Sequence, residues 1–290
     1  MTPPMPAILS ACLLLACLPV LAASEDDRPV EDAARFKLSR PANPQLPSLF
    51  LVGDSTVKCG TPGQRGWGEE FGKYFNPAAV NIVNHAIGGR SSRTFITEGR
   101  WAASLDMMRA GDFVIIQFGH NDGGPINDDS RARGSLRGTG PETEEIDNLL
   151  TARHEVVKTY GGYLRRYLAD ARAKGVTPYL CTQVPRKQWE ADSRRIIRPT
   201  DGTVVWARRV AEAEQATLLD LHETVAAAYD DLGPAGVDPL FADARTHTTS
   251  AGADLTARRV VQLLAGLPQS PWPPLLGVEG RGVVNRPPAD

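Results

Sequence analysis

SLFLVGDST at residues 48–56 joins an apolar run to a small polar loop, and FVIIQFGHND at residues 113–122 repeats that arrangement. Short apolar runs bounded by turn residues are typical of buried strands. If the two strands are neighbours in one parallel sheet, both loops open at its carboxyl edge, where ligand sites form in open α/β sheets. The sequence therefore predicts that Ser55 faces Asn121 at that edge.

The rest of the chain alternates strand-like and helix-like segments. The expected strands span 48–52, 80–84, 113–118, 176–181 and 217–220. The expected helices span 67–75, 100–109, 156–171, 203–216, 223–229 and 250–264. This alternation predicts an α/β fold, namely a three-layer α/β/α sandwich around a central parallel sheet of about five strands in flavodoxin-like order. Between these segments, residues 123–151 show no apolar period and predict a long loop.

Changes in composition divide the chain into four segments. The expected segments are a leader at 1–23, a linker or surface arm at 24–47, a folded domain at 48–267 and a proline-rich tail at 268–290. The leader carries an apolar run that is too short to span a membrane comfortably, and a secretory signal peptide cleaved near Ala22 or Ala23 fits it. Residues 14–17 also resemble a bacterial lipobox, which would leave Cys17 lipidated. We therefore expect a secreted or periplasmic protein, with lipid anchoring as the alternative.

Composition bounds the function classes. Apolar residues make up 42% of the chain, which allows a sizeable core, and the net charge of -2 gives no reason to expect nucleic acid or an anionic membrane as a partner. Beyond the leader, Cys59 and Cys181 remain, and the sequence leaves open whether they form a disulfide. The chain has no Cys-x-x-Cys and no His-Glu-x-x-His motif, so no metal site is expected.

The polar loops carry the groups that ester hydrolysis requires: a nucleophile, a base, and donors for the charge that develops on the carbonyl oxygen. Ser55 lies at a strand-to-helix turn, where its hydroxyl would reach the sheet edge and its N–H would face developing negative charge. Gly89 would add a second N–H, and Asn121 an uncharged amide donor. Each of these blocks, taken alone, is also compatible with an ordinary turn.

The chain has five histidines, and one of them would have to act as the general base. His85 falls in an expected strand, His154 at an expected helix start and His222 just after a strand. His247 instead lies in a polar loop that leads into the last expected helix. A lone histidine is more often structural, but together with Ser55 and Asn121 it is the favoured base.

Four of these blocks resemble, in order, those of the SGNH, or GDSL, hydrolase family. They are Gly-Asp-Ser at 53–55, Gly89, Gly-x-Asn-Asp at 119–122 and His247. The resemblance extends from about residue 48 to residue 264 and implies catalytic roles for Ser55, Gly89, Asn121 and His247. The sequences at 89–93, 117–122 and 246–253 resemble the rhamnogalacturonan acetylesterase branch.

One position departs from the family pattern. The family places an Asp three residues before the histidine, where this chain has Ala244, and Asp243 lies one residue earlier. Either a local bulge allows Asp243 to hold the Nδ1–H of His247, or a Ser-His dyad acts with a backbone carbonyl or water orienting the ring. We favour Asp243, because a carboxylate stabilises the imidazolium better.

The resemblance implies removal of O-acetyl groups from pectic polysaccharide, most specifically rhamnogalacturonan, whose galacturonates are negative. We expect Arg90, Arg93, Asp54 and Asp122 to contact the substrate. Further cations and aromatic rings on or near the expected loops offer carboxylate and sugar contacts, with solvated surface and helix packing as the alternative. They are Arg133, Arg137, Arg186, Lys187, Trp67, Trp101 and Trp189.

The expected partner is an acetylated polysaccharide or oligosaccharide, with no metal or organic cofactor, no nucleic acid and no membrane span. Two alternatives remain: a lipase or thioesterase of the same family, and an inactive carbohydrate-binding domain. The residues do not separate pectin from acetylated xylan, and they leave the position on the sugar and the oligomeric state open.

Overall fold

The computed structural model describes residues 36–191 and 194–285. The expected leader at 1–23 and the first part of the expected linker lie outside these residues, so both remain predictions. Within the described ranges, no helix is long and apolar enough to cross a membrane.

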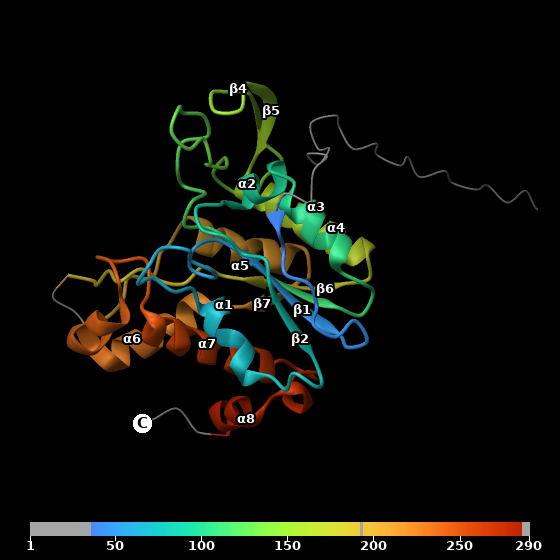
Figure 1. The fold of residues 1–290 in the computed structure, drawn as a ribbon. Helices are drawn as coiled ribbons and strands as arrows, with labels where there is room; N and C mark the ends of the chain where they lie inside the picture. Colours follow the sequence, from blue (N-terminus) through green and yellow to red (C-terminus); the bar gives the residue numbers. More distant parts are fainter. Residues whose placement is uncertain (1–35, 192–193, 286–290) are drawn as a thin grey trace, which may run out of the picture.

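Five parallel strands form the central sheet, as predicted. They are β1 (Ser48–Gly53), β2 (Asn81–Asn84), β3 (Phe113–Gln117), β6 (Thr177–Cys181) and β7 (Thr217–Leu219), and their order is β2-β1-β3-β6-β7. All six residues of β1 are buried, because helices cover both faces of the sheet (Figure 1). The last pair of β1 and β3 is Gly53 with Gln117, so the chain leaves both strands at the same level.

Alternate side chains of β1 enter two separate cores. Leu49 and Leu51 pack with one helix layer, and Phe50 and Val52 pack with the other. The first layer consists of α1 (Trp67–Glu70), α6 (Leu221–Val237), α7 (Ser250–Ala265) and α8 (Val278–Val284). The second consists of α2 (Ser92–Thr97), α3 (Arg100–Met107), α4 (Tyr160–Ala173) and α5 (Thr203–Ala213). The predicted three-layer sandwich is therefore confirmed.

A hairpin replaces part of the expected loop and helix. β4 (Thr143–Asn148) pairs antiparallel with β5 (Arg153–Lys158), and α4 starts only at Tyr160. Thr159 caps that helix by accepting the Gly162 N–H. The predictions of a loop through residue 151, of a helix from 156 and of His154 at a helix start are therefore wrong. Most of β4 is exposed and charged, so it lacks the apolar alternation that would have revealed a strand.

The proline-rich segment after residue 267 is anchored in the fold. Trp272 is fully buried, and its ring contacts Phe75, Phe113 and Tyr179. Its Nε1 donates to the Tyr179 hydroxyl at 3.2 Å. The segment therefore closes the first core.

The cysteines at 59 and 181 are both buried free thiols. Burial raises the pKa of the Cys181 thiol well above its usual value, and the charge of Asp220 adds to this effect. The disulfide left open by the sequence is therefore not formed.

Trp272→Ala should lower the free energy of unfolding by about 3–5 kcal/mol, because it removes a large side chain from a packed aromatic cluster. Urea unfolding followed by circular dichroism measures this change. Val278→Ala is the matched control, since Val278 is 74% exposed, and it should change stability by less than about 0.5 kcal/mol. Equal effects of the two substitutions would show that the segment after residue 267 does not stabilise the domain.

Candidate active site

Ser55 lies in the tight turn that follows β1. The carbonyl of Asp54 accepts the N–H groups of Val57 and Lys58, and the Asp54 carboxylate accepts the N–H and hydroxyl of Thr56. A Cβ at Gly53 would lie 2.5 Å from Val57 Cγ2, so only glycine allows the turn to fold back this closely. The turn leaves the Ser55 side chain partly exposed at the carboxyl edge of the sheet.

The loop before α7 brings His247 to this serine. Ser55 Oγ lies 2.9 Å from His247 Nε2, although the two residues are 192 positions apart. A pair of hydrogen bonds joins the loop to the chain before α1: Arg65 N–H donates to the Thr248 carbonyl, and the Thr248 hydroxyl donates to the Arg65 carbonyl. The structure thus brings together the expected nucleophile and the expected base.

Asp243 contacts the other ring nitrogen of His247. Its Oδ2 lies 2.5 Å from His247 Nδ1, while its Oδ1 accepts the N–H groups of Arg245, Thr246 and His247. This compact turn lets a carboxylate four residues before the histidine reach the ring. His247 therefore has a carboxylate partner even though position 244 is an alanine. With Nδ1–H donated to Asp243, Nε2 is free to accept the Ser55 proton.

Several hydrogen bonds keep Asp243 ionised. Partial burial by itself would raise the pKa of this carboxyl. The Thr246 N–H, the His247 ring, and the N–H groups of His247 and Arg245 outweigh burial and hold that pKa well below its usual range. A charged carboxylate therefore faces the ring throughout the neutral pH range.

Three candidate donors lie at the same carboxyl edge of the sheet as the serine. A Cβ at Gly88 would lie 3.5 Å from Ser55 Cβ, so the turn that carries Gly89, at φ 80°, passes directly beside the nucleophile. The N–H groups of Ser55 and Gly89 donate to no other residue in the part of the chain that the structure describes. Asn121 donates one amide hydrogen to the Arg90 carbonyl at 2.9 Å, which leaves its second hydrogen for a ligand.

Arg93 is committed to a buried ion pair, whereas the sequence led us to expect it at the substrate. Its side chain is fully buried and forms a bidentate ion pair with Glu155 of β5, with both N–O distances at 2.6 Å. Its Nη1 donates to the carbonyls of Ile126 and Gly134. Arg93 therefore fastens the hairpin and the preceding loop to α2.

Asp54 and Asp122 are also buried, so neither presents the exposed carboxylate that the expected contact with substrate would use. The Asp122 carboxylate accepts the Ser92 N–H, the Ser92 hydroxyl and the Ser135 hydroxyl. Burial raises its pKa to about 6, which the Ser92 hydrogen bonds oppose and the charge of Asp54 reinforces. Asp122 thus braces the loops that carry Gly89 and Asn121. Of the four residues expected to bind substrate, Arg90 alone keeps a partly exposed side chain, which pairs with Glu98.

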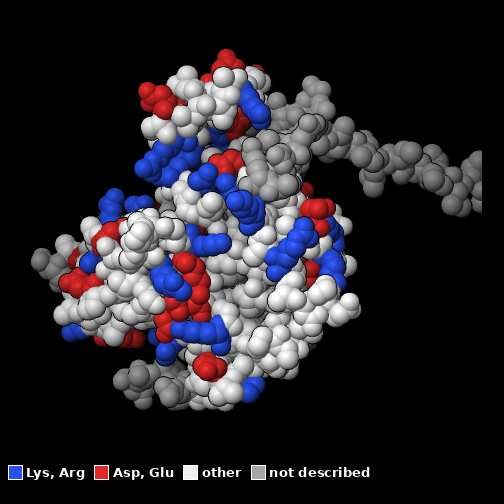
Figure 2. Space-filling model, viewed as in Figure 1, with Lys and Arg blue, Asp and Glu red and all other residues white. Residues whose placement is uncertain are grey.

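A cleft of about 710 Å³ begins at Asn121 and runs between the loop after β3 and the loop after β6. Lys and Arg side chains gather below the projecting hairpin in Figure 2. Three arginines expected near the site, Arg133, Arg137 and Arg186, line this cleft. Trp206 also lines it, a residue that sequence analysis assigned only to a helix.

The expected sugar-stacking tryptophans serve other purposes. Trp67 and Trp101 are buried and donate to Gln117 and Asp170, respectively. Trp189 is partly buried and packs against the first core. Lys187 forms an ion pair with Asp238.

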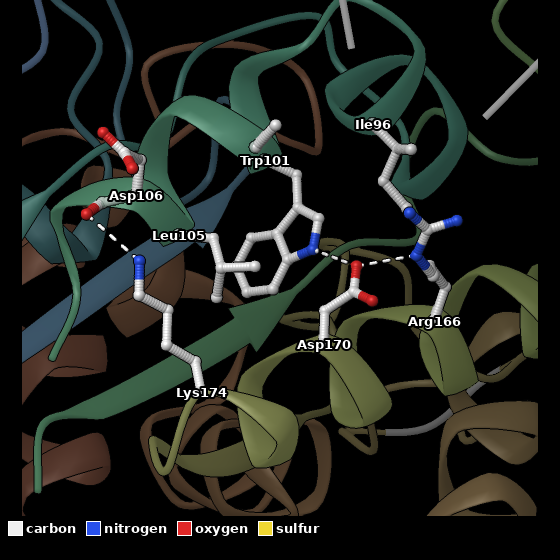
Figure 3. Close-up of a pocket in the computed structure, with 8 residues that line it drawn as sticks. Ile96, Trp101, Leu105, Asp106, Arg166, Asp170 and Lys174 are labelled. Atoms are coloured by element: carbon white, nitrogen blue, oxygen red, sulfur yellow. Dashed lines mark hydrogen bonds and ion pairs between the residues drawn. The ribbon is translucent and has the colours of Figure 1, made fainter. Parts of the chain in front are cut away.

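A second hollow, of about 310 Å³, lies between α3 and α4 (Figure 3). Its polar groups pair with one another: Asp170 accepts from Trp101 and Arg166, and Lys174 donates to the Asp106 carbonyl. It shares no lining residue with the cleft at Asn121. No cluster of metal-ligating side chains occurs among residues 36–191 and 194–285.

Comparisons with known proteins find a matching family and similar sequences. Residues 51–255 match the model of the GDSL-like lipase/acylhydrolase family. The chain is 32% identical over 210 residues to a rhamnogalacturonan acetylesterase of Emericella nidulans, covering 72% of this chain and 81% of that protein. It is also 32% identical over 221 residues to the probable rhamnogalacturonan acetylesterase YesY of Bacillus subtilis, covering 74% of this chain and 90% of that protein.

Solved structures show the same fold. Protein YXIM of Bacillus subtilis superposes with a TM-score of 0.60 at 24% identity, over 76% of this chain and 56% of that one. A variant of an acetyl-xylooligosaccharide esterase from Geobacillus superposes with a TM-score of 0.51 at 18% identity, over 77% of this chain and 95% of that one.

The bracing carboxyl at Asp122 should make stability depend on pH. Its folded-state pKa of about 6 lies above the unfolded value of about 3.9, so the folded chain binds more protons between these values and loses stability as pH rises through them. Asp122→Asn removes this titration. The unfolding free energy of the variant minus that of wild type should therefore increase by up to about 3 kcal/mol from pH 4 to pH 7.

Urea unfolding at both pH values measures this difference. Asp231→Asn, at an exposed position, is the control and should differ from wild type equally at both. A pH-independent difference for Asp122→Asn would contradict the prediction.

Proposed function

We propose that this chain, which belongs to the GDSL-like lipase/acylhydrolase family and is a carboxylic ester hydrolase, removes O-acetyl groups from plant cell-wall polysaccharide. The observation that carries the proposal is the continuous chain of contacts from Ser55 through His247 to Asp243. Pectic rhamnogalacturonan is the favoured substrate, because relatives 32% identical to this chain bear that activity in their names.

In the proposed reaction, His247 Nε2 takes the hydroxyl proton as Ser55 Oγ attacks the acetyl carbonyl carbon. The charged Asp243 carboxylate stabilises the imidazolium that forms. The carbonyl oxygen becomes an oxyanion held by the N–H groups of Ser55 and Gly89 and by the Asn121 amide. His247 then returns its proton to the sugar oxygen as the C–O bond breaks, which leaves an acetyl-enzyme.

Water completes the cycle. His247 removes a proton from water, whose oxygen attacks the acetyl-enzyme carbonyl, and the same donors hold the second oxyanion. Collapse of this intermediate returns the proton to Ser55 Oγ and frees acetate. Every step uses side chains and backbone groups of this chain.

The geometry favours a sugar ester over a long acyl chain. The cleft beside Asn121 carries Arg133, Arg186 and Gln183, which suit a hydroxylated or charged substrate better than an aliphatic tail. The alanine at position 244 is the reason to consider an inactive binding domain, because it replaces the acid of the family pattern. The contact of Asp243 with His247 removes that reason. We also propose that the leader at 1–23 directs secretion or export to the periplasm, with Cys17 lipidation as the alternative.

Ser55→Ala should abolish acetate release from acetylated rhamnogalacturonan and from 4-nitrophenyl acetate, because no other group in this site would form the acyl-enzyme. Acetate is measured enzymatically, and near-UV circular dichroism checks that the fold is intact. Ser130→Ala, at an exposed serine, should retain wild-type turnover. Full turnover by a folded Ser55→Ala variant would refute the nucleophile assignment.

Asp243→Asn should lower kcat by about 10³–10⁴-fold. The new amide keeps an oxygen for the three backbone N–H groups but presents NH2 to the ring, which favours the tautomer whose Nε2 carries the proton. Steady-state hydrolysis of 4-nitrophenyl acetate measures the loss, with Asp231→Asn as the control. A loss of less than about tenfold would instead favour the Ser-His dyad.

A further inference from the structure

Buried polar atoms without partners concentrate around the cleft. Within the described residues, such atoms occur in Asp54, His120, Arg186 and His222. The last three residues line the cleft that begins at Asn121. Because buried polar groups are almost always hydrogen-bonded, these unpaired groups distinguish the walls of the cleft from the rest of the described core.

The unpaired groups include a cation. Arg186 is half-buried, its Nε is fully covered, and its side chain forms no ion pair or hydrogen bond with any residue that the structure describes. Burial lowers the pKa of this guanidinium, and the charge of Arg245 adds to that effect, while Asp54 and Asp243 oppose it from a distance. Arg186 therefore lacks the carboxylate partner that a half-buried guanidinium ordinarily has.

Arg133 provides a second cation on the opposite wall. Its Nη1 donates to the Gly89 carbonyl at 3.2 Å, and no ion pair of this side chain occurs among the described residues. Burial and the charge of Arg131 lower its pKa. The other arginines expected to bind substrate have carboxylate partners: Arg90 with Glu98, Arg93 with Glu155, and Arg137 with Asp201.

We infer that Arg186, assisted by Arg133, binds the carboxylate of a uronic acid residue next to the sugar whose acetyl group meets Ser55. This inference rests on the proposed function. It states that one subsite, formed by these arginines, determines the preference for an anionic glycan. A guanidinium binds a carboxylate through two parallel hydrogen bonds, which fixes orientation as well as charge. Arg133 bonds to Gly89 and Asn121 lines the same cleft, so a sugar held here lies beside the oxyanion donors. Pro199 adds apolar surface at the wall of the cleft, whereas Trp206 is buried in the second core behind it.

The test compares two substrates that differ only in charge. Acetylated rhamnogalacturonan oligosaccharides are used with free carboxylates and with those carboxylates converted to methyl esters, and released acetate is measured. Wild type should show at least about tenfold higher kcat/KM on the acidic form, mainly through KM, since hydrogen bonds to charged groups contribute at this level. Raising the salt concentration should reduce this preference.

Arg186→Gln should lower kcat/KM on the acidic oligosaccharide about tenfold or more and leave the methyl ester and 4-nitrophenyl acetate within about threefold of wild type. Arg186→Lys keeps the charge without the paired donors and should fall between the two. Arg209→Gln removes an exposed arginine of α5 and serves as the charge-matched control. Thermal unfolding verifies that each variant is folded.

Three outcomes would overturn the inference. Equal wild-type turnover of the acidic and esterified oligosaccharides would remove the subsite and leave the esterase function standing. Equal loss on all three substrates in Arg186→Gln would assign Arg186 to the general integrity of the site. Release of no acetate from either oligosaccharide, with 4-nitrophenyl acetate still cleaved, would refute the proposed glycan function and the inference with it.

Discussion

Parallel pairing of β1 with β3 is the constraint on which the site depends. Their register ends with Gly53 opposite Gln117, so the turn that carries Ser55 and the loop that carries Asn121 leave the sheet at the same level. A slip of one residue would turn Leu49 and Leu51 toward the wrong core and move both loops. The burial of both sheet faces therefore fixes the position of the polar groups at its edge.

The parts of the fold that carry strong apolar patterns were predictable from sequence. The buried strands and the late amphipathic helix gave such signals, and the glycines and polar residues between them located the loops. The β4–β5 hairpin gave none, because most of its first strand is exposed and charged. Its stability comes from tertiary contacts such as the Arg93–Glu155 ion pair, which no local pattern contains.

The same limit applies to the candidate site. Ser55, Gly89, Asn121 and His247 are recognisable because each belongs to a short motif on a loop. Whether an arginine stabilises the fold or is available to a ligand depends on partners far away in the sequence. Glu155, 62 residues after Arg93, pairs with it and makes it structural, whereas Arg186 has no such partner among the described residues. The buried state of Asp54 and Asp122 likewise depends on loops packed over them.

The turn at Asp243 has a consequence for how related genes are classified. Its Oδ1 accepts hydrogen bonds from three successive backbone N–H groups. This places its Oδ2 against the His247 ring, although Asp243 lies four residues before the histidine. A search profile that demands an acid at the position of Ala244 would score this chain as a degenerate homologue and discard it. Genome surveys that allow either spacing would recover such sequences, and inspection of the turn would tell a shifted acid from a lost one.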